Sequence, residues 1–396
     1  ARLSGAMRAA ATVLVALLAG AVAYLYTLLG FNVVLSFNDS NCELLDPAQL
    51  SCCEDVTVVG HGRVLTGCGD FHNSINGDKA KAGQVFIIDA TGDKPVTRPI
   101  KLVGLPTTFP FHPHGLFWSN HTRRLYVISH GLALGGGERV FVFQGENQWD
   151  WAAPSLKFKT SLHVPDHVMP TGGMNDLVEG NPSGGDFYTT QWLQYPIAAA
   201  GKKHPANAAE KAHHVLNDLA MIFYPGSFVH HCTFDDSSTA ESTAVSCHKI
   251  LSGFFCANGI TTNPDRTQVF VNDVTAKKVH IYDRAAKGGN LTHTGYISLP
   301  HSADNIEYDT ASGKIHAGVL PIGHLALKKM TTAPETLVPG GSNVMEKDAT
   351  GKWIVKQTLM HDGGKLSMIS AGPVTNGKAF LGSPFSDGLL VCSVEE

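Results

Sequence analysis

Residues 304–319 read DNIEYDTASGKIHAGV. A polar pair and an apolar residue come first, a short strand follows, and a turn of small and polar residues leads to a second strand. The same order recurs at five other places, beginning at Glu54, His114, Asn175, Asn258 and Ser367. Most copies are followed by another pair of strands, so each unit holds four. Six units of four short strands are typical of a β-propeller, and the sequence predicts an all-β, six-bladed propeller.

The bulk composition agrees with a large folded domain. The 396 residues are 43% hydrophobic and 16% charged, which is ample for a buried core. The 41 glycines and 20 prolines suit many strands joined by tight turns. A β-sandwich or two separate β domains are the alternative folds. The net charge of −4 contains no basic block, so nucleic acid is not an expected partner.

The longest interval between copies, from Asn175 to Asn258, predicts an insertion at about residues 195–250. Within it, residues 201–219 (GKKHPANAAEKAHHVLNDL) predict a helix after Pro205. Cys232 and Cys247 flank a polar loop and could form a local disulfide. The insertion is expected over one rim of the ring, either shaping substrate entry or as a surface embellishment.

The amino-terminal segment, residues 1–37, differs from the rest. Its apolar centre, residues 9–31, is long enough to cross a bilayer as a helix. Arg2 and Arg8 precede it, so we expect a signal anchor with the amino end in the cytoplasm and residues 38–396 exported. A cleaved signal peptide, followed by secretion, is the alternative.

Two further features indicate the secretory pathway. Asn38, Asn120 and Asn290 each begin a glycosylation sequon. The eight cysteines form no zinc-like pair, so some should be bridged in an oxidising compartment. Cys42 and Cys392 lie near the two ends of the predicted ring, and a bond between them would join those ends.

The repeat also predicts a metal site, because the first strand of each blade lines the central channel. First-position residues would converge there: Glu54, His114, Asn175, Asn258, Asp304 and Ser367. The next position adds Asp55, Asp176 and Asn305. Oxygen ligands without thiolate favour calcium, and the carboxylates would repel one another without a cation. The set is enough for one Ca²⁺ or, as we expect, two, because strand alternation would place the members of each pair at different depths.

Two histidines accompany this set. His114 begins one blade, and His130 ends the outgoing strand of the same blade. A histidine pair on neighbouring strands could share a proton and activate water near neutral pH. We therefore expect His114 and His130 to be the catalytic pair.

Several ordered motifs resemble the paraoxonase/arylesterase family between Cys42 and Cys392. They are SCCEDVTV at Glu54-Asp55, PHGL around His114, MNDLV at Asn175-Asp176, FFCANGI at Asn258, ADNIEYD at Asp304-Asn305 and the final LLVCSV. Each motif is short, but their order and register agree. The resemblance implies a calcium-dependent six-bladed propeller that hydrolyses aryl esters or lactones, with a terminal disulfide and an uncleaved hydrophobic amino-terminal segment.

The resemblance also assigns roles to residues. It implies a catalytic calcium held by Glu54, Asn175, Asn258, Asp304 and Asn305. It implies a structural calcium held by Asp55, Asp176 and the backbone carbonyl of Leu116. The catalytic ion would polarise the substrate carbonyl, with Asn175 and Asn258 alongside. Water would lose its proton to His114 or to a metal-facing carboxylate. The sequence does not decide which of the two is the base.

The pocket wall departs from the family pattern. Cys256 replaces an aromatic residue, Leu320 replaces a histidine, and the segment after Tyr188 lacks the expected acidic and histidine residues. The resemblance therefore indicates hydrolysis without naming a substrate. The alternatives are a gluconolactonase-like or strictosidine-synthase-like propeller and a non-enzymatic, calcium-stabilised binding propeller.

Overall fold

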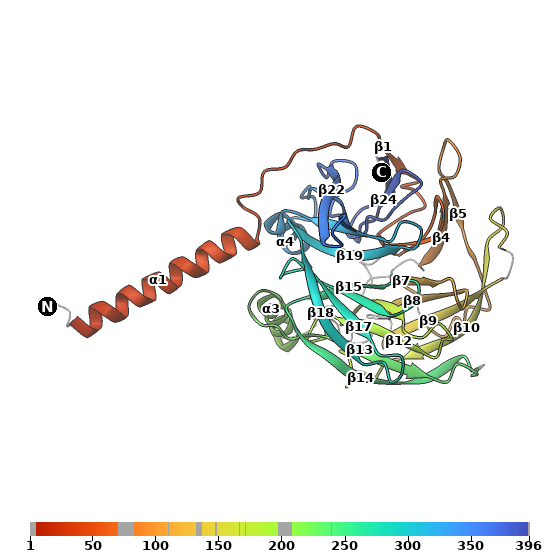
Figure 1. Cartoon of the computed structure of the whole chain (residues 1–396), viewed down its shortest axis with the longest axis horizontal. Helices are drawn as coiled ribbons and strands as arrows, with labels where there is room; N and C mark the ends of the chain where they lie inside the picture. The colour runs from red at the N-terminus through yellow and green to blue at the C-terminus, as the bar shows by residue number, and fades with distance from the viewer. Residues whose placement is uncertain are drawn as a thin grey trace.

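The protein is a ring of β-sheets with one helix extending from it (Figure 1). The computed structural model describes residues 5–69, 83–109, 111–131, 137–146, 149–165, 167–170, 172–196, 208–238 and 240–394. The first strands of neighbouring blades contact one another around the axis, and three of these strands are buried along their whole length. The predicted all-β propeller is confirmed.

The first three blades account for the amino-terminal half of the ring. Blade 1 contains β2 (Cys53–Gly60), β3 (Arg63–Cys68), β4 (Gln84–Asp89) and β5 (Val96–Pro99). Blade 2 contains β7 (Pro113–Ser119), β8 (Arg124–Gly131), β9 (Gly137–Gly145) and β10 (Ser155–His163), with β6 (Lys101–Val103) paired to β10. Blade 3 contains β11 (Met174–Glu179), β12 (Asp186–Gln191), β13 (Ser227–Phe234) and β14 (Ser242–Phe254). Parallel pairing of β10 with β14 joins blades 2 and 3 at their outer strands.

The last three blades complete the ring. Blade 4 contains β15 (Ala257–Thr262), β16 (Gln268–Asp273), β17 (Lys278–Arg284) and β18 (Leu291–Ser298). Blade 5 contains β19 (Ser302–Asp309), β20 (Lys314–Leu320), β21 (Gly340–Lys347) and β22 (Trp353–His361). Blade 6 contains β23 (Val374–Thr375), β24 (Lys378–Leu381) and β25 (Leu389–Ser393), with β1 (Cys42–Leu45) as its outer strand.

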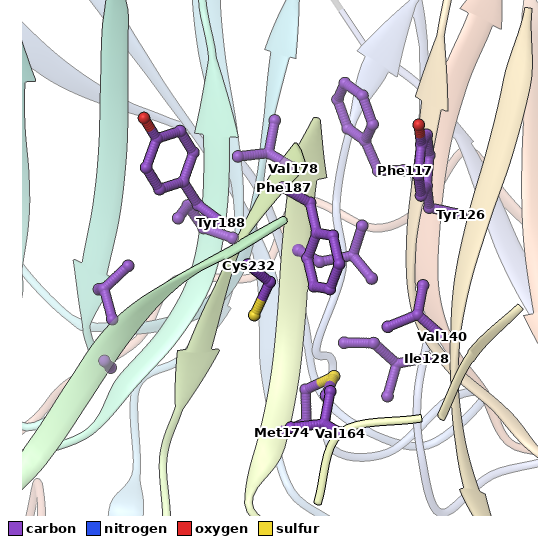
Figure 2. Close-up of a cluster of buried hydrophobic side chains, with 14 of the residues drawn as sticks. Phe117, Tyr126, Ile128, Val140, Val164, Met174, Val178, Phe187, Tyr188 and Cys232 are labelled. Atoms are coloured by element: carbon purple, nitrogen blue, oxygen red, sulfur yellow. The ribbon is translucent and has the colours of Figure 1, made fainter. Parts of the chain in front are cut away.

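The hydrophobic core lies between the faces of adjacent blades. Figure 2 shows one such cluster, where Phe117 and Tyr126 of blade 2 face Val178 and Phe187 of blade 3. These side chains alternate with residues of the opposite face along each strand, as the period of a β-strand requires. Because both faces of a blade are buried against its neighbours, the beginning of its first strand is the part that lines the channel.

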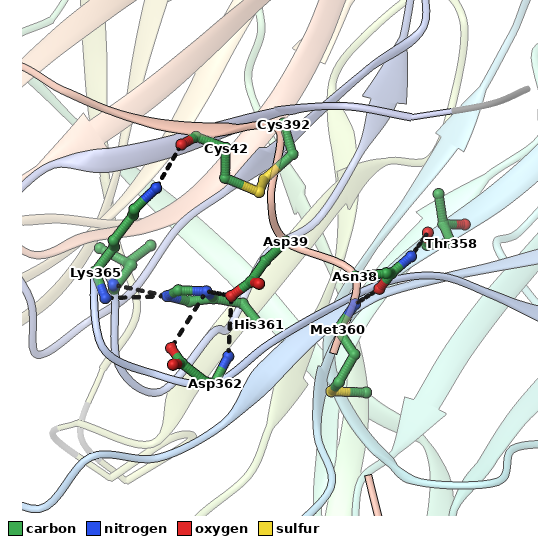
Figure 3. The surroundings of a disulfide bond; sticks show 10 residues. Asn38, Asp39, Cys42, Thr358, Met360, His361, Asp362, Lys365 and Cys392 are labelled. Atoms are coloured by element: carbon green, nitrogen blue, oxygen red, sulfur yellow. Dashed lines mark hydrogen bonds and ion pairs between the residues drawn. A yellow bond between two sulfur atoms is a disulfide. The ribbon is translucent and has the colours of Figure 1, made fainter. Parts of the chain in front are cut away.

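The two ends of the chain close the ring together. β1 pairs antiparallel with β25, and the predicted disulfide between Cys42 and Cys392 is present within that pairing (Figure 3). The side-chain amide of Asn38 donates to the carbonyl of Thr358 and accepts from the N–H of Met360. A bond that closes so long a loop strongly restricts the unfolded chain.

The same junction holds a buried histidine. Nε2 of His361 accepts the backbone N–H groups of Lys365 and Leu366, at 3.1 and 3.2 Å. Nδ1 therefore carries the proton and donates to the carboxylate of Asp39 (Figure 3). Both ring nitrogens of His361 are hydrogen-bonded, so its contact with Asp39 fixes the amino-terminal segment to blade 5.

The other disulfides tie neighbouring strands. Cys232 and Cys247 are bonded across β13 and β14, as predicted. Cys53 and Cys68 are bonded across β2 and β3, which the analysis of the sequence did not predict. Cys52 and Cys256 lie outside the disulfides.

Helix α3 (Ala208–Phe223) forms part of the insertion. The helix predicted over residues 201–219 is confirmed from Ala208 onward and continues to Phe223, whereas residues 201–207 lie outside the described residues. β13 and most of β14 also fall within the predicted insertion, so these residues belong to blade 3 rather than to an element over the rim.

Helix α1 (Gly5–Leu28) extends from the ring (Figure 1). Phe31, beyond its end, stacks on His324 of α4 (Gly323–Thr331), with ring centroids 4.1 Å apart. Within the part of the chain that the structure describes, no helix is long and apolar enough to cross a membrane. The predicted anchor stays a prediction.

Candidate metal centre and histidine pair

The polar positions of the repeat coincide with breaks in strand register. In five blades the pairing of the first two strands shifts at these positions: between Cys53 and Asp55, Pro113 and Leu116, Met174 and Leu177, Ala257 and Ile260, and Ala303 and Ile306. A β-bulge bends the strand and redirects its side chains. The simple alternation assumed in the prediction is therefore interrupted at these positions.

Two glycines allow neighbouring blades to approach closely there. A Cβ on Gly115 would lie 2.4 Å from the carbonyl oxygen of Asn175 and 2.9 Å from Cα of Asp176. A Cβ on Gly259 would lie 2.8 Å from Cα of Asn305. Only glycine fits these contacts without displacing the next blade's polar pair.

Five predicted ligands share one property. They are buried or nearly so, and among the residues that the structure describes each has a buried side-chain oxygen without a hydrogen-bond partner. We call these atoms the five channel oxygens: Glu54 Oε2, Asn175 Oδ1, Asn258 Oδ1, Asp304 Oδ1 and Asn305 Oδ1. A buried polar atom without a partner is unfavourable, so the set fits a cation with oxygen ligands.

Hydrogen bonds hold these side chains in place around the channel. Nδ2 of Asn305 donates to Oε1 of Glu54 at 2.7 Å, joining blade 5 to blade 1. Asn258 lies close enough to Asp304 to lower the pKa of its carboxyl, so blades 4 and 5 also meet at the channel. The bond between Asn305 and Glu54 leaves Oδ1 of Asn305 and Oε2 of Glu54 as channel oxygens.

The second-position aspartates are satisfied by backbone groups. Asp55 accepts the N–H of Leu116 at 2.7 Å and that of Val56 at 2.8 Å. Asp176 accepts the N–H of Ile260 at 2.8 Å and that of Leu177 at 2.7 Å. These carboxylates thus link blade 1 to blade 2 and blade 3 to blade 4. Because their oxygens already accept hydrogen bonds, the predicted second ion has less support than the first.

In the sixth copy of the repeat, Ser370 rather than Ser367 contacts the channel side chains. The hydroxyl of Ser367 is bonded to Thr336 and Val338 and takes no part in the channel set. The carbonyl of Ser370 instead accepts the N–H of Asn305, and its hydroxyl donates to the carbonyl of Glu54. The assignment of Ser367 was wrong because the chain before β23 is irregular, which shifts the contact by three residues.

The crowded acids are electrostatically costly. Burial, together with the charges of Asp55 and Asp304, raises the pKa of Glu54 well above its ordinary value. Burial raises the pKa of Asp304 to about 7 and that of Asp55 to about 6, although hydrogen bonds to each oppose the shift. Burial also raises the pKa of Asp176. Metal-free protein therefore favours protonated carboxyls, and a cation would favour the charged forms.

The predicted histidines lie together beside this centre. Both rings are buried, with centroids 4.6 Å apart. Nδ1 of His114 lies 3.1 Å from the carbonyl oxygen of Asn175 and 3.6 Å from Oε2 of Glu54. Burial and the neighbouring His130 hold the pKa of His114 well below its ordinary value, so its ring is neutral at pH 7.

One polar neighbour of the pair was missed. Glu138 lies opposite His130 in the β8–β9 pairing, and Nδ1 of His130 is 3.0 Å from its Oε2. The signal in the sequence is weak, because an acidic residue on an outer strand normally faces solvent. Glu138 is nevertheless fully buried.

The predicted sequons lie on the surface. Asn38, Asn120 and Asn290 are exposed. The amide of Asn38 is engaged at the ring closure, and Oδ1 of Asn120 accepts the indole N–H of Trp118. Glycosylation at these sites stays a prediction.

Comparison with known proteins agrees with the motifs. The Arylesterase family model matches residues 241–393. Serum paraoxonase/lactonase 3 of rabbit (Oryctolagus cuniculus) and of human are each 25% identical over 351 residues, spanning 87% of this chain and 86% of the relative. Serum paraoxonase/arylesterase 2 of chicken (Gallus gallus) is 23% identical over 357 residues, spanning 88% of each. The chain is thus similar to the paraoxonase/arylesterase family over most of its length.

The solved structures that are similar to this chain are more distant. The periplasmic gluconolactonase of Pseudomonas aeruginosa has a TM-score of 0.46 at 11% identity, with 87% of this chain and 83% of that chain covered. The calcium-binding protein regucalcin of Agrobacterium tumefaciens has a TM-score of 0.45 at 12% identity, with 92% and 96% covered.

The close approach of Gly259 to the next blade predicts the effect of adding one methyl group there. We expect Gly259→Ala to displace Asn305 and weaken calcium binding roughly 5- to 150-fold, the equivalent of an overpacking cost of about 1–3 kcal/mol. Calorimetric titration with calcium measures the change. Gly295→Ala in β18, where a Cβ meets nothing within 4 Å, is the control and should bind like the wild type. Equal affinity of the two variants would contradict the prediction.

The raised pKa values of the channel carboxyls predict how pH affects the stability of the protein. Asp304 and Asp55 have folded-state pKa values of about 7 and about 6, against 3.8 when unfolded. The folded metal-free state binds more protons between pH 4 and 7, so these groups lower its stability as pH rises through that window. Unfolding temperatures of calcium-depleted protein at pH 5 to 8 should show this loss, calcium should remove it at pH 8, and Asp304→Asn should reduce it. An unchanged slope in Asp304→Asn would contradict the assignment.

Proposed function

We propose that the protein is a calcium-dependent hydrolase of carboxylic esters, aryl esters or lactones in particular. The five channel oxygens beside a buried histidine pair carry this proposal. They supply a cation site next to a neutral base, which is the combination that metal-assisted ester hydrolysis needs. The names of the relatives, which include lactonases and arylesterases, support the same reaction class.

The chemistry of the donors supports calcium as the ion. Glu54, Asn175, Asn258, Asp304 and Asn305 would hold it through hard oxygens. The nearby thiol of Cys256 does not offer a competing soft ligand, because burial raises its pKa well above the ordinary value. A second ion at Asp55, Asp176 and the carbonyl of Leu116 stays a prediction.

A bound calcium would polarise the substrate carbonyl and stabilise the oxyanion. His114 is placed to act as the base. The carbonyl of Asn175 only accepts hydrogen bonds, so neutral His114 carries its proton on Nδ1 and its lone pair on Nε2. Nε2 can then take a proton from the attacking water, and the adjacent His130 can share it.

We propose that the protein functions in the secretory pathway or outside the cell. Three disulfides agree with an oxidising compartment. The apolar side chains of α1, including Val13 and Leu17, are exposed, and we propose that this segment attaches the protein to a membrane unless it is removed. An ester or lactone remains the expected small-molecule partner.

Hydrolysis of phenyl acetate and of an aliphatic lactone tests the function. Calcium-loaded protein should hydrolyse at least one of them, and calcium depletion should abolish the rate. Asn258→Ala should lower kcat/KM by about 100-fold or more, as the loss of an electrostatic contact to the reacting group does. Asn181→Ala, an exposed turn residue of the β11–β12 hairpin, is the matched control and should keep the wild-type rate.

The outcomes separate the competing functions. A folded protein that binds calcium but hydrolyses neither substrate would contradict the proposal and favour a binding propeller. Hydrolysis that persists without calcium would contradict the role of the metal.

A further inference from the structure

Glu138 is a buried acidic residue whose carboxylate contacts the ring of His130. The two residues are direct partners in the β8–β9 register, and Glu138 is 0% exposed. Its Oε2 and Oε1 lie 3.0 and 3.2 Å from Nδ1 of His130, and Oε1 also accepts the backbone N–H of Gly172. The carboxylate therefore has fixed contacts on both sides.

These contacts determine the tautomer of His130. An ionised carboxylate only accepts hydrogen bonds, so Nδ1 of His130 must carry a proton. Nδ1 of His114 is likewise occupied by the carbonyl of Asn175. Each ring is thus held at Nδ1, and the two rings lie next to each other, with centroids 4.6 Å apart.

We propose that Glu138 is the positioning residue of the histidine pair, holding His130 in the Nδ1–H tautomer and in the orientation that receives a proton from His114. The proposal rests on the proposed hydrolysis. When His130 takes the proton that His114 removed from water, the Glu138 carboxylate faces the new imidazolium. The proton returns through His114 to the oxygen of the leaving group, which restores the pair in each turnover.

Glu138→Gln is the informative substitution because it changes one property of the side chain. Glutamine has the same shape, and its carbonyl oxygen can still accept from Gly172. Its amide N–H₂ would face Nδ1 of His130 and require the Nε2–H tautomer. A comparable acid-to-amide change in the serine protease triad lowers kcat by about 10⁴-fold.

The first readout is kinetic. We expect Glu138→Gln to lower kcat by about 100-fold or more, while KM, calcium affinity and unfolding temperature change little. In a His130→Gln background the same substitution should have no further effect, because Glu138 acts through His130. Glu179→Gln removes another fully buried carboxylate, one bonded to Ser119 and Tyr126, and should lower the unfolding temperature while keeping kcat.

The second readout does not depend on activity. Nitrogen-15 NMR of labelled histidines reports the tautomer of His130, assigned by comparison with His130→Gln. The Nδ1–H form in wild type and the Nε2–H form in Glu138→Gln are expected. The same tautomer in both proteins, a kcat within threefold of wild type, or equal losses in the presence and absence of His130 would overturn the proposal. If the wild type is inactive on every ester, the proposed function fails while the tautomer still decides the role of Glu138.

Discussion

The structure depends on bringing the five channel oxygens together in a buried channel. Each belongs to a side chain held by the fold, and none of the five oxygens has a hydrogen-bond partner among the described residues. The carboxyls among them have raised pKa values because burial and mutual repulsion oppose their charge. A cation would relieve both penalties, so the atoms proposed to bind it also destabilise the metal-free protein.

This arrangement explains why the ring has to close. Glu54 lies in blade 1 and Asn305 in blade 5, yet the two side chains are bonded to each other. Around the ring, blade 6 lies between those two blades, and it is completed by β1 from the other end of the chain. The β1–β25 pairing and the Cys42–Cys392 disulfide thus close the ring across which Glu54 and Asn305, 251 residues apart in the chain, are bonded.

The sequence predicted the fold and most of the centre because both follow from one repeated pattern. Polar pairs in register place Asn175, Asn258 and Asp304 in the channel, whatever the detailed geometry. The β-bulges were not predictable, since a bulged strand and a regular strand share the same pattern of polar and apolar residues. Ser370 and Glu138 were missed for a related reason: their roles come from an irregular segment and from cross-strand pairing, neither of which local spacing reports.

X-ray diffraction from crystals of the calcium-loaded protein tests the central claim most directly. The account predicts anomalous density for an ion in the channel, with oxygens of Glu54, Asn175, Asn258, Asp304 and Asn305 at about 2.3–2.6 Å. A channel without such density, with the five oxygens bonded to one another or to water, would contradict the claim that these atoms form a calcium site.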